Sequence, residues 1–459
     1  MSTTDVQEIL SRSVGSFIDP DNSFREKLEK KVKGEYEKDI VVKLGIDPTR
    51  PDIHLGHAVI LRKLRQFQDL GCKVIFLVGD VTALIGDPTG KSKVRPELEM
   101  AEIQRNMQTF LDQVGKILRT DDSVFSWITN SEWFMNVVDI SVGPDSKVEI
   151  APGQFVDPNS FVGKAAIFDK TRRQVSALGM KSVFAFSFVN FLSVLRHITH
   201  SRLIARDMFQ DRLREGAELY MHEMMYPVLQ GMDSVAIARI YGSCDLEIGG
   251  TDQTFNMLMG RDIMQMSKLP EQAVMSLEII PGLDGKEKMS KSLDNYIAIT
   301  DSANDMYGKV MSIPDTAIAT FFRLATYAPL AEIEELSKEL AAEKTNPRDV
   351  KMRLARQIVA EYHGEEASLA AEANFVETFS KGGVPTDIQT VKAAKGDKFV
   401  DILLSQKIIE SKSEWRRLVE EGAVTNTDTG EKIGSPDAAL ENSLTLKIGK
   451  RRFIKIETL

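Results

Sequence analysis

Two histidines that stand three residues apart are the first candidates for chemistry. His54 and His57 come at the start of an amphipathic helical pattern, with Gly56 between them. At a helix start this spacing puts both imidazoles on one side, beside backbone N–H groups that have no partner within the helix. That end of a helix also attracts anions, phosphate above all. Because His197 and His200 have the same spacing, the pair alone does not separate a phosphate site from a capped surface helix.

The stretch GDPTGKSK could also bind phosphate. Only three residues stand between Gly86 and Gly90, whereas a P-loop needs four, which argues against a conventional P-loop nucleotide hydrolase. The stretch still supplies a cationic loop suited to phosphate, with Lys91, Lys93 and Arg95. Taken alone, it is also compatible with a solvated turn.

The stretch KEKMSKS is the sharper signal. A glycine-containing turn precedes its cations and hydroxyls, which are Lys286, Lys288, Ser290, Lys291 and Ser292. A mobile loop of this kind can bring ammonium groups onto a triphosphate as charge builds on the leaving pyrophosphate. By itself it could be a charged surface loop.

The elements that must position these residues are readable from the hydrophobic pattern. Residues 40–46, IVVKLGI, form an apolar run typical of a buried strand. A helix with one apolar face follows and ends at Gly71, and CKVIFLVGD reads as a second buried strand. Strand, helix and strand in this order predict a parallel sheet of the doubly wound kind, with ligands beyond the carboxyl ends of its strands. The histidine loop and GDPTGKSK lie at that edge, so we expect one site.

Composition and charge limit the class of protein. Apolar and charged contents of 42% and 27% over 459 residues are typical of a globular chain with roughly two to four domains. The start of the chain has no secretory pattern, and no apolar stretch approaches the roughly 18 residues of a spanning helix. We therefore expect a cytoplasmic protein without membrane contact. Cys72 and Cys244 form neither a metal-type cluster nor a disulfide framework, and we expect no protein-bound metal.

A net charge of −9 argues against non-specific binding of nucleic acid. The segment LTLKIGKRRFIKIE is an exception, with Lys447, Lys450, Arg451, Arg452 and Lys455. Lysines on a strand edge discourage aggregation, so a solubilising edge and an RNA-binding surface both remain open on these residues alone.

The order of patterns along the chain predicts three domains. Residues 142–185 read as an insertion, 190–275 as mostly helical apart from DLEIGGTDQTFN, and 302–380 as helical. KGDK at 395–398 reads as a linker before a compact mixed segment. The predicted fold class is α/β: a doubly wound, Rossmann-like domain (1–280), an α-helical domain that begins with the KMSKS stretch (281–390) and a small α+β domain (393–459).

The two motifs together resemble a known family. His54-Leu55-Gly56-His57 is similar to the HIGH signature of class I aminoacyl-tRNA synthetases, and residues 288–292 read KMSKS. KLGIDPTRPDIHLGH, LVGDVTALIGDPTGKSKVRP, NSEW, YPVLQGMDS, EIGGTDQTFN and KMSKSLDNYI narrow the resemblance to the tyrosyl-tRNA synthetases, bacterial type. The resemblance covers most of the chain, with 142–185 as the main gap.

The resemblance implies a role for each matching residue. Thr49, His54 and His57 would contact the triphosphate and ribose, and the pyrophosphate would be held by Lys91, Arg95, Lys288 and Lys291. The other nucleotide contacts would come from Gly45, Asp47, Gly250 and Asp252. The amino acid would be bound at its ammonium by Asp87, Tyr226 and Gln230, near its carboxylate by Gln253, and at its phenol by Asp233. Tyr226, Gln230 and Asp233 fall on one helix face.

Two positions depart from the family pattern. Lys43 stands where many members have a tyrosine that helps bind the phenol, and Met232 stands where an aromatic residue is frequent. Tyrosine stays the expected substrate, with a modified tyrosine or another aromatic amino acid as the alternative.

The segment 393–459 resembles the small RNA-binding domain that bacterial tyrosyl enzymes share with a ribosomal small-subunit protein. SKSEWRRLVEEGAVTNTDTGEKI carries the match, with Arg416 and Arg417 on a helix. The resemblance therefore implies RNA contacts from Arg416, Arg417, Lys447, Lys450, Arg451 and Arg452.

The whole resemblance implies a homodimeric tyrosine–tRNA ligase that uses ATP with Mg²⁺ and charges tRNA(Tyr). Two alternatives remain: an adenylyltransferase of the same nucleotide-binding superfamily that does not use tRNA, and a catalytically silent RNA-binding paralogue.

Overall fold

The structure is a computed structural model that describes residues 3–89, 98–134, 148–151, 154–156, 188–290, 293–380, 388–406, 408–409, 411–449 and 452–459. These residues form two compact units. The first unit comprises residues 1–301 and 309–354, and the second comprises 302–308 and 355–459.

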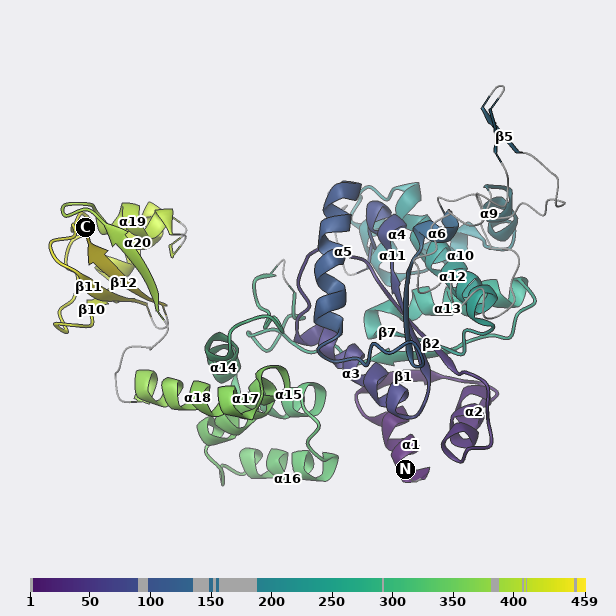
Figure 1. Cartoon of the computed structure of the whole chain (residues 1–459), viewed down its shortest axis with the longest axis horizontal. Coiled ribbons are helices and arrows are strands. Elements are labelled where there is room, and N and C mark those ends of the chain that lie inside the picture. The colour runs from purple at the N-terminus through teal and green to yellow at the C-terminus, as the bar shows by residue number, and fades with distance from the viewer. Residues whose placement is uncertain are drawn as a thin grey trace. The chain divides into compact units, whose positions relative to one another are not determined.

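A six-stranded sheet organises the first unit (Figure 1). Its order is β1 (Val14–Ile18), β8 (Ala273–Leu277), β7 (Leu246–Gly250), β2 (Val41–Ile46), β3 (Lys73–Val78) and β4 (Phe125–Thr129). The neighbours are parallel except for β1, which pairs antiparallel with β8. Strands β2 and β3 are the two that the sequence predicts, and the α/β class with a parallel sheet is as expected.

Helices cover the sheet on two faces. Helix α12 (Met221–Tyr241) and helix α13 (Thr254–Met266) share a core with Val41, Ile75 and Leu77 of β2 and β3. Alternate strand residues point to the opposite face, and helix α3 (Leu55–Asp69) packs there with Leu61, Leu64 and Phe67 buried. Gly71, with a φ of 83°, follows the end of α3 as predicted.

Further described helices and one 3-10 turn precede β8 in the chain. They are α1 (Thr3–Ser11), α2 (Ser23–Val32), α4 (Asp80–Ile85), α5 (Met100–Val114), α6 (Ser131–Phe134), α9 (Phe188–Leu195), α10 (His200–Ile204), α11 (Asp207–Arg214) and the 3-10 turn η1 (Thr251–Gln253). Within the predicted insertion 142–185, the structure describes only the backbone of β5 (Val148–Ala151) and β6 (Gln154–Val156), which form a two-stranded antiparallel sheet.

The sequence correctly predicts helices for most of 190–275, but it misses β7 and β8. The stretch DLEIGG is a buried strand between β2 and β8, and its two glycines end that strand. The helical pattern of 302–380 is found as α14 (Ala303–Met311), η3 (Asp315–Ala317), α15 (Ile318–Ala325), α16 (Leu330–Ala341), α17 (Pro347–His363), α18 (Glu365–Phe375) and the π-helical turn η4 (Val376–Ser380).

The C-terminal part contains a four-stranded sheet with a core of its own. The order is β10 (Val424–Asn426), β11 (Leu444–Ile448), β12 (Arg452–Thr458) and β9 (Gln389–Ala393), and α19 (Phe399–Ser405) and α20 (Lys412–Glu420) pack on it. Because β9 pairs with β12, this fold begins at Gln389, ahead of the predicted start at 393. KGDK is therefore a turn inside the fold and not a linker, since Gly396 N donates to Leu440 O.

Among the described residues, no helix has the length and apolar composition needed to cross a membrane.

Candidate active site

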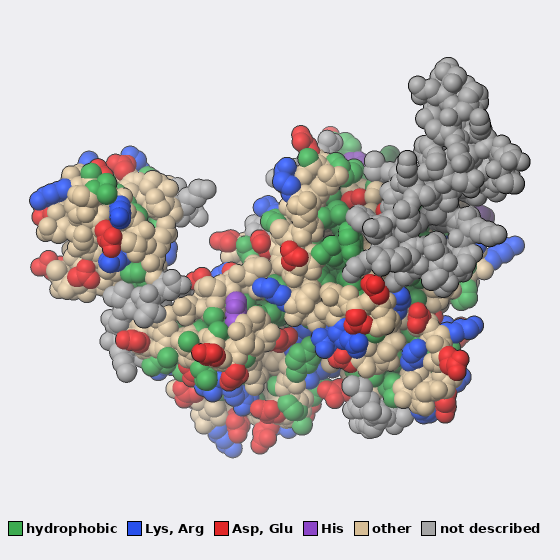
Figure 2. All heavy atoms as spheres, in the orientation of Figure 1, with side chains coloured by type: hydrophobic (Ala, Val, Ile, Leu, Met, Phe, Trp, Pro, Cys, Tyr) green, Lys and Arg blue, Asp and Glu red, His purple; other side chains and the backbone are tan. Residues whose placement is uncertain are grey.

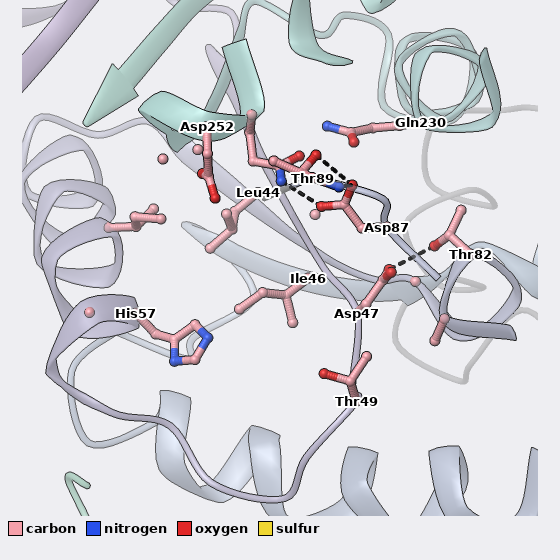
Figure 3. Close-up of a pocket in the computed structure, with 18 of the residues that line it drawn as sticks. Leu44, Ile46, Asp47, Thr49, His57, Thr82, Asp87, Thr89, Gln230 and Asp252 are labelled. Carbon is pink, nitrogen blue, oxygen red and sulfur yellow. Dashed lines mark hydrogen bonds between the residues drawn. The ribbon is translucent and has the colours of Figure 1, made fainter. Parts of the chain in front are cut away.

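A cavity of about 680 Å³ opens beyond the carboxyl ends of β2, β3 and β7. This is the edge at which a parallel sheet binds ligands, and the volume suits a small-molecule site. The loops after β2 and β3 both line it, as the strand order predicts. Figure 3 shows Asp47, Thr49, His57, Asp87 and Asp252 arranged around this cavity.

The two histidines begin helix α3. His54 is the N-cap residue, and its Nδ1 accepts a hydrogen bond from Gly56 N at 3.1 Å. The Nδ1 of His57 accepts one from His54 N at 3.3 Å, and the ring centroids are 4.0 Å apart. A neutral imidazole that accepts at Nδ1 carries its proton on Nε2. Both rings line the cavity, so each can present a donor at the positive end of the helix.

Asp47 follows β2 and joins two walls of the cavity. Thr82 Oγ1 of α4 donates to its Oδ1 at 2.8 Å, and the Tyr226 hydroxyl of α12 donates to its Oδ2 at 2.9 Å. These two hydrogen bonds hold the loop that carries Thr49 in place. Because the Tyr226 hydroxyl donates its proton to Asp47, its oxygen can act as a hydrogen-bond acceptor toward other groups. Gly45, at the end of β2, also lines the cavity.

Asp87 is buried and held on both carboxylate oxygens. Thr89 donates to Oδ1 through its backbone N (3.0 Å) and its Oγ1 (2.6 Å), and Gln253 Nε2 donates to Oδ2 at 2.6 Å. The guanidinium of Arg206 donates to Thr89 Oγ1 at 2.9 Å and stacks over Phe255. Asp87 thus offers a fixed negative charge to the cavity.

The loop after β7 forms the opposite wall. Asp252 lies in η1, and the ammonium of Lys288 is 3.3 Å from its Oδ2. A side chain at Gly250 would bring its Cβ to 2.7 Å from Asp252 Oδ1, so glycine keeps this wall open. The predicted residues Lys91, Arg95 and Lys291 lie outside the described residues.

The deep end of the cavity is lined by Gln230, Asp233 and Glu247. Asp233 is 3% exposed, and its Oδ1 accepts from Trp133 Nε1 at 2.9 Å. Burial raises the pKa of Asp233 to about 7, against the opposing effect of the Lys43 ammonium. Tyr226, Gln230 and Asp233 all come from α12, where their spacing predicts one shared face, and all three line the cavity.

The structure separates the two positions that depart from the family pattern. Met232 is buried in the core shared by α12 and α13, so it is not part of the cavity wall. Lys43 is fully buried behind the deep end of the cavity, with its Nζ 2.9 Å from Glu247 Oε1.

Sequence reasoning gave no role to Glu247, Trp133 or Arg206. Trp133 lies in NSEW and Glu247 begins EIGGTDQTFN, two segments that resemble the family without implying a role for either residue. The available signal was Lys43, a charge inside an apolar strand, because a buried ammonium requires a buried carboxylate. No local pattern marked Arg206.

The basic residues of the C-terminal part differ in their surroundings. Arg416 and Arg417 are exposed on α20, whereas Arg452 pairs with Glu414 at 2.8 Å and donates to Ile408 O. The ammonium of Lys447 lies over the Phe453 ring. On the face seen in Figure 2, acidic and basic side chains are interspersed over this part. Lys450 and Arg451 lie outside the described residues.

Comparisons with known proteins bear on the whole chain. The family described as "tRNA synthetases class I (W and Y)" matches residues 35–140 and 186–380. The tyrosine–tRNA ligase of Moorella thermoacetica is 38% identical over 453 residues, 98% of this chain and 95% of that protein. The tyrosine–tRNA ligase of Thermotoga maritima is 36% identical over 458 residues, 99% of this chain and 98% of that protein.

Solved structures agree on the architecture. A C-terminally truncated mitochondrial tyrosyl-tRNA synthetase of Aspergillus nidulans has a TM-score of 0.57 at 19% identity, over 82% of this chain and 95% of that one. The tyrosyl-tRNA synthetase of Archaeoglobus fulgidus complexed with L-tyrosine has a TM-score of 0.53 at 18% identity, over 81% of this chain and 100% of that one. At this identity the likeness bears on the fold alone, and it confirms the predicted α/β class.

Proposed function

We propose that this chain, which belongs to the tyrosyl-tRNA synthetase family of class I tRNA synthetases, is a tyrosine–tRNA ligase. Family membership confirms the resemblance carried by HLGH and KMSKS. Tyrosine reacts with ATP to give tyrosyl-adenylate and pyrophosphate, and the tyrosyl group then passes to the 3′ end of tRNA(Tyr). Because the relatives match nearly end to end, the proposal covers the whole reaction.

One observation carries the proposal: a single cavity is lined by a histidine pair at a helix start and by buried carboxylates at its deep end. The first arrangement suits a triphosphate, which needs donors and positive potential. The second suits an amino acid with a hydroxyl on its side chain, which needs hydrogen-bond acceptors. An enzyme that joins an amino acid to a nucleotide requires both in one place.

Adenylation at this site depends on positioning and charge. The carboxylate of tyrosine attacks the α-phosphorus of ATP, and the bond to the pyrophosphate oxygen breaks. His54 and His57 donate to the phosphate oxygens as negative charge shifts toward the leaving group, and Thr49 adds its hydroxyl. No protein base is needed, because the attacking carboxylate is already ionised at neutral pH.

Lys288 can reach the leaving pyrophosphate without a large penalty. Its pair with Asp252 has side chains 41% and 29% exposed, and exposed pairs of this kind contribute only about 0–1 kcal/mol. When Lys288 moves to the phosphates, Asp252 becomes available for the ribose hydroxyls. Lys91, Arg95 and Lys291 complete the set of cations, and Gly45, Asp47 and Gly250 line the nucleotide.

The amino acid is held at both ends. Asp87 and the oxygens of Tyr226 and Gln230 receive its ammonium, and Gln253 lies near its carboxylate. Asp233 accepts the hydrogen bond of the phenol. Mg²⁺ enters with ATP as part of the substrate and neutralises the triphosphate charge.

The C-terminal sheet with Arg416, Arg417 and Lys447 is proposed to bind tRNA. The guanidinium of Arg452 is already engaged by Glu414 and Ile408 O, so it is the weakest of the described candidates. Lys450 and Arg451 lie outside the described residues, and we propose them as RNA contacts on the sequence resemblance alone. A homodimer, a cytoplasmic location and the three-domain division complete the proposal.

Tyrosine-dependent exchange of labelled pyrophosphate into ATP, without tRNA, tests the proposal. We expect exchange with tyrosine and far less with phenylalanine or tryptophan. Exchange followed by failure to charge tRNA(Tyr) would favour an adenylyltransferase, and absence of exchange with every aromatic amino acid would favour a silent RNA-binding paralogue.

A further inference from the structure

Lys43 and Glu247 form a buried ion pair that the proposed adenylation chemistry does not use. Their side chains are 0% and 1% exposed, and Lys43 Nζ lies 2.9 Å from Glu247 Oε1. Lys43 comes from β2 and Glu247 from β7, the two strands at the centre of the sheet. Removing two charges from water costs several kcal/mol per ion after relaxation, and apolar residues of similar size often serve stability equally well. The pair therefore invites an explanation beyond packing.

The surroundings fix the pair in one geometry. Lys43 Nζ also donates to Ser234 Oγ at 2.9 Å and to Gln230 O at 3.2 Å, both on α12. Glu247 accepts from Gln230 Nε2 at 3.1 Å, from Ser234 Oγ at 3.2 Å and from Gln272 Nε2. The ammonium thus has three described partners, and the carboxylate is bonded on both oxygens. A network satisfied in this way is rigid.

Asp233 shares this region, one residue before Ser234. The charged groups that act on its carboxyl are Lys43 of β2 and Glu247 of β7, and its neutral donors are Trp133 of α6 and Asn130. Cys244, just before β7, stays a neutral thiol beside Lys43 because burial raises its pKa. Burial lowers the pKa of Lys43, but Glu247 and Asp233 outweigh this and raise it above its ordinary value.

The two partners of the pair act on Asp233 in opposite directions. Burial raises the pKa of Asp233 to about 7; the Lys43 charge lowers it, and the Glu247 charge raises it by a smaller amount. Asp233 therefore sits near the midpoint of its titration at neutral pH. A carboxyl in that condition can change between acceptor and donor when one neighbouring charge changes.

Resting on the proposed function, we propose that the buried Lys43–Glu247 pair is a positioning element that keeps Asp233 a hydrogen-bond acceptor for the side-chain hydroxyl of the substrate. The site then selects rings with a neutral donor at the para position. Rings that carry only an acceptor there, such as a methoxy or nitro group, leave the Asp233 carboxylate without a partner.

Two substitutions, which remove charges of opposite sign from the pair, test the inference. The readout is kcat/KM for tyrosine in pyrophosphate exchange as a function of pH, because this quantity reports ionisations of the free enzyme. With ionised Asp233 required, kcat/KM falls as pH falls through its pKa. Lys43→Met should move this fall to higher pH, and Glu247→Gln should move it to lower pH. Because the pKa of Asp233 is about 7, a shift of one pH unit in Lys43→Met corresponds to a loss of about fivefold in kcat/KM at pH 7, approaching about tenfold below pH 6.

A matched control separates this effect from the loss of a buried ion pair in general. Arg212 and Glu223 form a pair that is 2% and 4% exposed, between α11 and α12, and neither is among the groups that act most strongly on the pKa of Asp233. Arg212→Met should lower stability without moving the pH profile. The double variant Lys43→Met with Glu247→Gln leaves neither buried charge unpaired. It should fold even where Lys43→Met does not, and its upward shift should be smaller.

The outcomes are distinguishable. Opposite shifts in the two single variants, with an unmoved profile in Arg212→Met, support the inference. Equal shifts, shifts in one direction, or unmoved profiles in the variants that fold would overturn it. If the wild-type chain exchanges no pyrophosphate with tyrosine, the proposed function itself fails; tyrosine activation with unmoved profiles overturns the positioning role alone.

Discussion

Replacing Thr89 by valine should weaken tyrosine binding although residue 89 is not proposed to touch the substrate. Its hydroxyl donates to Asp87 Oδ1 at 2.6 Å and accepts from Arg206 Nη2 at 2.9 Å. Thr89 is 5% exposed and valine has nearly the same shape, so the substitution removes two hydrogen bonds and little packing. Both bonds involve a charged group.

The magnitude follows from these contacts. A hydrogen bond to a charged group contributes about 1.5–3 kcal/mol, which for the Asp87 bond corresponds to a loss of about 10- to 100-fold in affinity for the ammonium. We expect the lower end, because Thr89 N and Gln253 still hold the carboxylate. The Arg206 bond bears on stability, since among the described residues its Nη1 is already buried without a partner. The free energy of unfolding should fall by about 1.5–3 kcal/mol.

Tyrosine binding by calorimetry, KM for tyrosine in pyrophosphate exchange, and urea unfolding measure these effects. Thr89→Ser is the matched control, because serine keeps the hydroxyl and loses only a methyl group. It should bind tyrosine nearly as well as the wild type. Equal affinity and equal stability in the valine and serine variants would show that the Arg206–Thr89–Asp87 chain of hydrogen bonds does not support the ammonium site.

Four further outcomes are expected. Tyrosine should be preferred over phenylalanine by about 10⁴–10⁵, and Asp233→Ala should reduce this ratio in exchange assays, because a site built for a hydroxyl rejects the analogue without it; equal activation of phenylalanine by the wild type would contradict the substrate. Lys288→Ala and Lys291→Ala should each slow adenylation about 10²-fold in single-turnover assays with little change in tyrosine binding; a rate near wild type would remove the KMSKS loop from the mechanism. Deleting residues 388–459, the boundary set by β9, should preserve exchange but weaken tRNA binding in a salt-dependent way; normal charging would remove the RNA role. Burial lowers the pKa of Lys63 to about 7, so the unfolded chain binds more protons above pH 7 and stability should rise from about pH 7 to about pH 10.5; in denaturant titrations Lys63→Met should lose that rise.

The sequence predicts the part of the fold that depends on local pattern. The apolar run at 40–46, the helix ending at Gly71 and the strand after it are found where expected, because a parallel strand buried on both faces leaves an unmistakable apolar run. The sequence pattern does not predict strand β7, because two glycines and two acidic residues dilute the apolar pattern of DLEIGG. Strand β7 nevertheless lies at the centre of the sheet. KGDK has the composition of a linker, and only the long-range pairing of β9 with β12 shows that it is a turn.

The residues of the site also fall into two groups, those that the sequence assigns and those that only the structure shows. His54, His57, Tyr226, Gln230 and Asp233 could be assigned to one site through the family resemblance, and helix periodicity adds that Tyr226, Gln230 and Asp233 share one face. The partners of Asp87 and Asp233 could not, since Arg206 and Trp133 reach them from segments more than 90 residues away in the chain. Such contacts arise from tertiary packing and leave no local trace in the sequence.

The antiparallel pairing of β1 with β8 has a consequence for the order in which the chain is synthesised. Val14 of β1 pairs with Leu277 of β8. The first strand of the sheet to leave the ribosome therefore cannot form its pairing until the last strand has been synthesised. Strands β2, β3 and β4 can assemble earlier, because they follow one another in the chain and pair in that order. Long-range pairing of this kind is slow and exposes a strand edge in the meantime. The HLGH helix is therefore made well before the wall that faces it, and the nascent chain should acquire its nucleotide site only after residues 246–277 have emerged.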